Sequence, residues 1–89
     1  MKPAELKILL SKEKLEKDVI NRIRWDTKLN TQDFSIRYLD RMKNTLAEVP
    51  YTAITIDGDF FKHEESQIPM HRIREIRYKG EVVWAKRRK

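Results

Sequence analysis

The chain has 89 residues, enough for one domain with a modest hydrophobic core. It contains no cysteine, which excludes disulfides and thiolate metal sites, and no apolar run approaches the roughly 18 residues of a membrane-spanning helix. The formal net charge is +6: residues 1–70 hold twelve basic and twelve acidic side chains, whereas residues 71–89 hold eight basic and two acidic ones.

The first third of the chain is predicted to be helical. Pro3 suits the first position of a helix, and leucines follow it at helical spacing. Over residues 12–24, apolar side chains fall on one stripe and charged ones lie mostly opposite. We expect this second segment to be an amphipathic helix that covers a sheet and ends near Arg24.

The remainder of the chain is predicted to be rich in strands joined by tight turns. Asp57-Gly58 is a strong hairpin signal, and Gly80 can adopt the positive φ that a hairpin tip needs. The expected strands are residues 34–39, 45–49, 54–56, 60–63, 74–78 and 81–86. The fold class is therefore α+β: an N-terminal helical segment packed on a curved antiparallel sheet of about five strands, built from hairpins and able to close towards a barrel.

One sequence pattern occurs twice, nineteen residues apart. Residues 49–54 and 68–73 share the order apolar, Pro, apolar, two variable residues and Ile. Since proline fixes its own φ, the pattern predicts two turns that each lead into a strand. Only the second copy carries His71 and Arg72, and the excess positive charge begins there. Such a charge excess favours a phosphate-bearing partner, although a solvated surface with a basic tail is the alternative.

Five sequence blocks carry a resemblance to a known family: NRIRWD (21–26), FSIRYLDR (34–41), VPYTAI (49–54), IPMHRIREIR (68–77) and GEVVW (80–84). Together they resemble a family of small, mostly archaeal proteins, formerly a domain of unknown function and now described as an RNA cyclic-group-end recognition domain. The resemblance extends from about Asp18 to Lys86. We therefore expect a single domain over residues 1–89, with a helical N-terminal extension (1–14), a family core (15–86) and a basic tail (87–89).

His71 is the sharpest candidate for contact with an anionic ligand. It lies beside Arg72 and close to Arg74, so its ring can donate a hydrogen bond to a phosphate oxygen in basic surroundings. The alternative is a structural histidine bonded to a backbone carbonyl, and spacing alone does not separate the two. The resemblance implies that this histidine contacts a terminal phosphate. His63 matches no fixed family position and is expected at the surface.

A second set of candidates lies nearer the N-terminus. Arg41 could reach a phosphate, and Asp40 could orient an arginine or bind a ribose hydroxyl, with Arg37 beside them; a cross-strand ion pair is an equally good interpretation. Tyr38 and Trp25 could offer a stacking surface for the last base of an RNA. A tryptophan at a helix end is, however, more often a lid over the core.

Three functions remain open. The first is an RNA-binding module that recognises processed ends, 2′,3′-cyclic phosphate or a related terminal phosphate, in RNA repair or processing; this ligand is implied by the resemblance. The second is an RNA-end processing enzyme, phosphoesterase or ribonuclease-like, with His71 as general acid or base. The third is a basic adaptor for protein partners. The sequence favours binding without catalysis, because a second well-placed acid–base group is missing.

The remaining expectations concern ligands and location. Neither histidine belongs to a spacing that supplies three or four metal ligands, so we expect no metal and no other cofactor. The expected partner is RNA, single-stranded or at a processed end, with RNA-processing proteins as further candidates. No membrane contact is expected, because the helix lacks a large apolar face. The charged start of the chain is unlike a signal peptide, which favours a cytoplasmic protein.

Overall fold

A computed structural model of the chain describes residues 2–86, so the basic tail predicted at 87–89 lies outside it. The helices are α1 (Pro3–Leu10) and α2 (Glu16–Trp25). The strands are β1 (Phe34–Asp40), β2 (Thr45–Pro50), β3 (Ile54–Asp57), β4 (Phe60–His63), β5 (Ser66–Pro69), β6 (Ile73–Tyr78) and β7 (Glu81–Ala85). Three short 3-10 helices each lead directly into a strand: η1 (Thr31–Asp33), η2 (Tyr51–Ala53) and η3 (Met70–Arg72).

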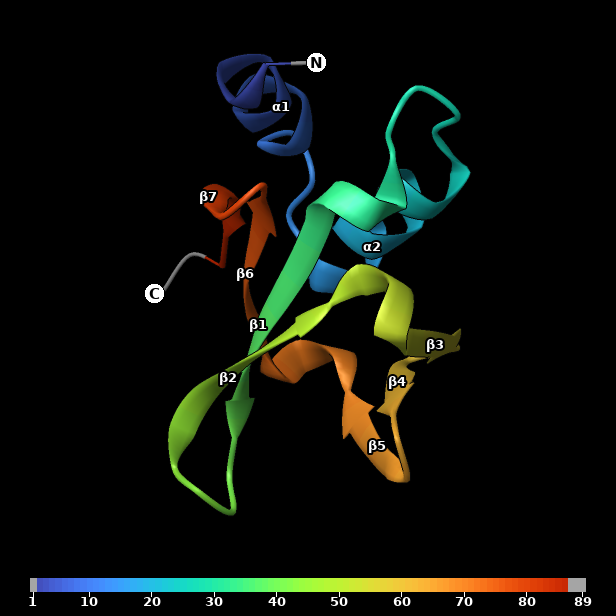
Figure 1. Cartoon of the computed structure of the whole chain (residues 1–89), viewed down its shortest axis with the longest axis vertical. Coiled ribbons are helices and arrows are strands. Elements are labelled where there is room, and N and C mark those ends of the chain that lie inside the picture. The colour runs from blue at the N-terminus through green and yellow to red at the C-terminus, as the bar shows by residue number, and fades with distance from the viewer. Residues whose placement is uncertain (1, 87–89) are drawn as a thin grey trace.

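The strands form two antiparallel sheets, with the orders β2-β1-β6-β7 and β3-β4-β5 (Figure 1). The predicted α+β class with antiparallel hairpins is confirmed. The described residues differ from the expected single sheet in having seven strands in two sheets, neither of which closes into a barrel. The strand absent from the prediction is β5, which buries only Ile68 and ends in Pro69, so it shows no alternating pattern.

The repeated proline pattern marks the two places where the chain crosses between the sheets. After β2 the chain passes through Pro50 and η2 into β3 of the smaller sheet, and after β5 it returns through Pro69 and η3 to β6. Both prolines have nearly the same backbone angles, with φ −63° and ψ 143° at Pro50 and φ −61° and ψ 140° at Pro69. The pattern is therefore structural: each copy is a proline-initiated turn that leads into a strand.

The helices follow the predicted apolar stripe with one change in their bounds. Pro3 is the first helical residue of α1, as expected, but α2 begins at Glu16, because Leu15 is extended (φ −104°, ψ 144°). The helix ends at Trp25, close to the predicted end. Among the residues described, no helix has both the length and the apolar character needed to span a membrane.

The core lies among the helices and the two sheets, and both helices contribute to it. Its helical part consists of fully buried side chains: Leu6 and Leu10 from α1, and Val19, Ile20 and Ile23 from α2. Helix α1 packs beside β7, near the top of Figure 1. The buried Tyr51 of η2 donates a hydrogen bond of 2.9 Å to the Ile20 carbonyl and so ties the first crossing to α2.

Candidate functional site

The second crossing presents His71 on the surface and anchors its neighbour in the core. Met70 is 4% exposed, whereas His71 is exposed. The Met70 N–H donates to the Asp59 carbonyl (2.9 Å) in the β3–β4 turn, and Asp59 in turn pairs with Lys17 of α2 at 2.9 Å. Met70, the first residue of η3, and Ile73, which follows η3, are both buried. They hold the turn in place while the side chain of His71 faces solvent.

Two cations converge on the backbone of His71. Its carbonyl oxygen accepts hydrogen bonds from Arg74 Nη1 (2.9 Å) and Lys86 Nζ (3.0 Å). Arg74 was predicted to contact phosphate, and in the structure one of its donors supports the histidine from within the chain. Arginine has five donors and lysine three, so both side chains keep further hydrogen-bonding capacity.

Lys86 also connects this turn to the start of α2. Its Nζ lies 2.6 Å from Glu16 Oε1, and Glu16 is 7% exposed, the one charged residue buried in the described chain. Next to this pair, Trp84 Nε1–H donates to the Glu13 carbonyl (3.0 Å), which fixes the linker between the helices on β7. Sequence reasoning missed these supporting residues, since the partners lie about seventy positions apart and no local pattern links them.

Arg72 differs from Arg74 at this turn because its side chain does not bond to the backbone of the described residues. Its side chain is half-buried, and its Nε atom is buried without a hydrogen-bond partner among residues 2–86, as are the Nε atoms of Arg22, Arg37 and Arg77. Nor does Arg72 form an ion pair within that range, as the salt bridges of the described chain show. The terminal guanidinium nitrogens of Arg72 are thus not paired with a carboxylate of the described chain and are available to donate to an anionic ligand.

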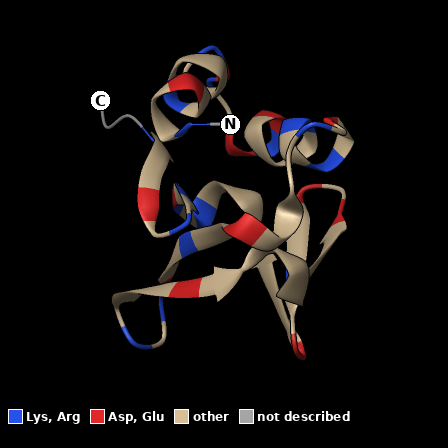
Figure 2. Cartoon of the chain, turned by 45° about the horizontal axis from the view of Figure 1, so that its top comes forward, with Lys and Arg blue, Asp and Glu red and all other residues tan. Residues whose placement is uncertain are grey.

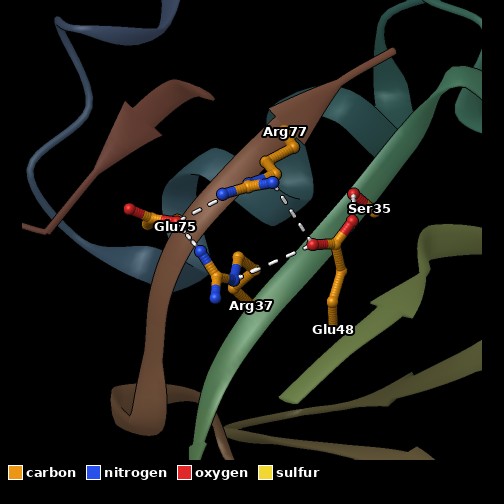
Figure 3. Close-up of polar contacts among 5 residues, drawn as sticks. All are labelled: Ser35, Arg37, Glu48, Glu75 and Arg77. Atoms are coloured by element: carbon orange, nitrogen blue, oxygen red, sulfur yellow. Dashed lines mark hydrogen bonds and ion pairs between the residues drawn. The ribbon is translucent and has the colours of Figure 1, made fainter. Parts of the chain in front are cut away.

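Arg37 lies instead in an ion-pair network on one face of the larger sheet, which we call the outer face (Figure 3). Its Nη1 is 3.2 Å from Glu75 Oε1 and its Nε is 3.8 Å from Glu48 Oε1. Arg77 bridges the same two carboxylates at 3.6 and 3.7 Å, and Ser35 Oγ donates to Glu48 (2.9 Å). Two positive and two negative charges therefore offset one another, as the ion-pair interpretation of Arg37 requires.

Asp40 and Arg41 lie at the β1–β2 hairpin, which projects at the lower left of Figure 1. Asp40 Oδ1 accepts hydrogen bonds from the backbone N–H groups of Met42 (3.0 Å) and Lys43 (3.3 Å), so this carboxylate shapes the turn. Arg41 is exposed, and the hairpin tip is basic (Figure 2, lower left). These two residues belong to a different element from His71.

The two aromatic candidates have opposite environments. Tyr38 is 8% exposed and meets Phe61 edge-on with ring centroids 5.5 Å apart, and burial, followed by the charges of Asp40 and Glu64, raises the pKa of its hydroxyl. It is therefore a core residue with little surface for stacking. Trp25 is 71% exposed, with the Arg24 guanidinium 5.0 Å from its ring centroid, so the core-lid interpretation is wrong.

The candidates thus occupy separate places in the fold. His71, Arg72 and Arg74 lie together at η3 and the start of β6, whereas Trp25 is the last residue of α2, nine residues after Glu16. Within residues 2–86, no three His, Asp or Glu side chains gather as a metal site would require.

Comparison with known proteins identifies one family over most of the chain. Residues 14–86 match the family model described as the MJ1316 RNA cyclic group end recognition domain. A UPF0248 protein of Metallosphaera sedula is 38% identical over 72 residues, which covers 79% of this chain and 90% of the relative. UPF0248 proteins of Methanococcus maripaludis strain C5 (38% over 74 residues, 80% and 97% covered) and Saccharolobus solfataricus (39% over 74 residues, 76% and 91% covered) are similarly close. No solved structure matches the chain.

Proposed function

Because the chain belongs to the MJ1316 RNA cyclic group end recognition domain family, we propose that it is an RNA-binding module that recognises processed RNA ends, with 2′,3′-cyclic phosphate or a related terminal phosphate as its ligand. Such ends arise when RNA is cleaved, so the protein would act in RNA repair or processing. The binding unit would be the whole chain as one domain, since the helix preceding the family match contributes to the core.

The observation that carries the proposal is the pairing of an exposed histidine with an uncompensated arginine on one rigid turn. The imidazole of His71 would donate to an oxygen of the terminal phosphate, and the Arg72 guanidinium would supply charge and two-pronged geometry. Arg74 and Lys86, which bond to the His71 carbonyl at 2.9 and 3.0 Å, would hold the turn in position before RNA arrives. A preorganised turn loses little conformational entropy when the ligand binds.

The experiment measures the affinity of one short single-stranded RNA that ends in a 2′,3′-cyclic phosphate, a 3′-phosphate or a 3′-hydroxyl. Wild-type protein should distinguish the ends. His71→Ala should lose roughly tenfold to a hundredfold in affinity for the preferred end, the value of a charge-assisted hydrogen bond, and with it most discrimination. Arg72→Ala should weaken both phosphorylated ends together, because its charge acts on either.

His63→Ala is the matched control, because His63 is half-exposed at the end of β4 and outside η3. It should leave both affinity and discrimination unchanged. Thermal unfolding of each variant separates binding from folding: His71 is exposed, so its removal should leave Tm almost unchanged. A destabilised His71→Ala that still selects one end would contradict the site assignment, and cleavage of the RNA by wild-type protein would favour the enzymatic alternative.

A further inference from the structure

A groove of about 370 Å³ lies on the outer face of the larger sheet, between the base of the β1–β2 hairpin and the β6–β7 edge. Leu39 and Leu46 face each other across β1 and β2, two residues beyond the Arg37–Glu48 pair, and so lie on the same face of the sheet. The lining residues of interest come from four strands and the hairpin turn: Leu39, Leu46, Ala85, Asn44, Arg74 and Lys86.

The groove has one apolar side and one cationic side. Leu46 is 42% exposed, which leaves apolar surface open to a ligand. Arg74 and Lys86 line the groove as well; Lys86 is paired with Glu16 (2.6 Å), so the positive charge on this side comes from Arg74, which has no carboxylate partner among the described residues. One carboxylate, Glu75, also lines the groove, but its pairs with Arg37 (3.2 Å) and Arg77 (3.7 Å) offset its charge.

The groove adjoins the turn that carries His71. Arg74 and Lys86 line the groove, and the same two side chains donate to the His71 carbonyl. A ligand in the groove therefore lies next to η3. Arg74 and Lys86 then stand between the leucines of the groove and His71. Asn44, in the hairpin turn with φ 53°, adds amide donors and an acceptor at the rim.

We propose that this groove holds the base of the nucleotide whose phosphate is bound at His71 and Arg72. A nucleotide has a flat, weakly polar ring joined through ribose to a phosphate, which matches the order of leucines, cations and histidine. The base would lie against Leu39 and Leu46, its polar edge would face Asn44, and Arg74 and Lys86 would contact the ribose or phosphate between. This inference rests on the proposed function and adds to it a nucleoside subsite for single-stranded RNA.

The experiment compares two short RNAs that carry the same terminal 3′-phosphate, one with a complete last nucleotide and one whose last ribose has hydrogen in place of the base. Wild-type protein should bind the complete RNA about fivefold more tightly, below the effect of stacking on an aromatic ring because the wall is aliphatic. Leu46→Ser should reduce this preference to less than about twofold, since a hydroxymethyl group in place of the isobutyl group removes most of the wall. Ile8→Ser is the matched control: Ile8 is 70% exposed on α1 and does not line the groove, so the preference should persist.

The outcomes distinguish this inference from the proposal on which it rests. Equal binding of the two RNAs by wild-type protein that still separates 3′-phosphate from 3′-hydroxyl overturns the groove assignment alone. A preference that survives in Leu46→Ser, or that disappears equally in Ile8→Ser, also overturns it. Failure of wild-type protein to separate the phosphorylated end from the hydroxyl end overturns the proposed function and the base subsite together.

Discussion

At residues 71 and 72 the second crossing between the sheets carries His71 and Arg72, where the first carries Thr52 and Ala53. The backbones of the two turns are closely similar, and each buries the residue after its proline, Tyr51 or Met70. The same local structure therefore serves two purposes. The first turn is tied to α2 by a hydroxyl, and the second carries an exposed imidazole beside a half-buried arginine.

The Tyr51 hydroxyl predicts a loss of stability in alkaline solution. Burial raises its pKa to about 12 from the ordinary value of about 10, and the neutral hydroxyl donates to the Ile20 carbonyl. A raised folded-state pKa means that the stabilisation is complete below pH 10 and is lost as pH rises towards 12, because the unfolded chain releases its proton first. In that window the free energy of unfolding should fall by about 1.4 kcal/mol per pH unit from this group.

Tyr51→Phe separates this contribution from that of the other titrating groups. The variant should be less stable than wild type at neutral pH by about 1 kcal/mol, because the hydrogen bond from the hydroxyl to the Ile20 carbonyl is lost. Between pH 10 and 12 its stability should decline less steeply than that of wild type. Denaturant unfolding at a series of pH values measures both slopes, and parallel slopes would show that Tyr51 does not cause the decline.

At the scale of elements, α1 lies outside the family match yet belongs to the core. Leu10 is fully buried, whereas Ile8, on the same helix, is 70% exposed. Leu10→Ala should destabilise the protein by about 2–5 kcal/mol through lost burial and a cavity. Ile8→Ala should change stability by no more than about 0.5 kcal/mol. In thermal unfolding the first variant should lower Tm by about 10 °C or more, and equal Tm values for the two variants would show that α1 is dispensable.

The elements most accessible to sequence reasoning were those defined by local chemistry. The glycine at each of two hairpin tips and the repeated proline pattern each predict a structure within a few residues of itself, and both are confirmed. The apolar stripe predicted over residues 12–24 is confirmed for Val19, Ile20 and Ile23, whereas Leu15 precedes the helix and is 59% exposed. The division of the strands into two sheets was not predictable in this way. It depends on which strands pair, and β1 finds its second partner, β6, about forty residues away.

The candidate site shows the same division between local and long-range information. Exposure of His71 follows from its place on a short turn between two buried residues, and the local sequence predicts that turn. The roles of Arg37 and Arg74 depend on partners that only the fold brings near: Glu48 and Glu75 for the first, the His71 carbonyl for the second. Sequence alone marks a basic cluster but does not show which of its charges are already paired.

For the molecule as a whole, the important quantity is the positive charge that the fold leaves uncompensated. Of the arginines in β6 and η3, Arg77 is paired with carboxylates and Arg74 bonds to the backbone, which leaves Arg72 without a partner within residues 2–86. The sequence adds three further cations at positions 87–89, half of the total net charge of +6. A long-range field from the tail and a short-range contact at η3 should therefore contribute to RNA binding in different ways.

This division predicts separate effects on salt dependence and on end preference. RNA affinity should fall steeply with salt, by about 0.7 in log–log slope for each phosphate neutralised on a single strand. A chain that ends at Lys86, without Arg87, Arg88 and Lys89, should show a slope smaller by up to about 2, because three cations no longer displace counterions. Its preference among cyclic phosphate, 3′-phosphate and 3′-hydroxyl ends should remain, since that preference would come from hydrogen bonds at η3 that salt screens only weakly.

Titrations of the three RNAs over a range of salt concentrations measure both the slope and the end preference. His71→Ala in the full chain supplies the opposite case, a lost preference with an almost unchanged slope. If removal of the tail altered end preference and left the slope alone, the tail would belong to the recognition site, and the assignment of specificity to η3 would be wrong.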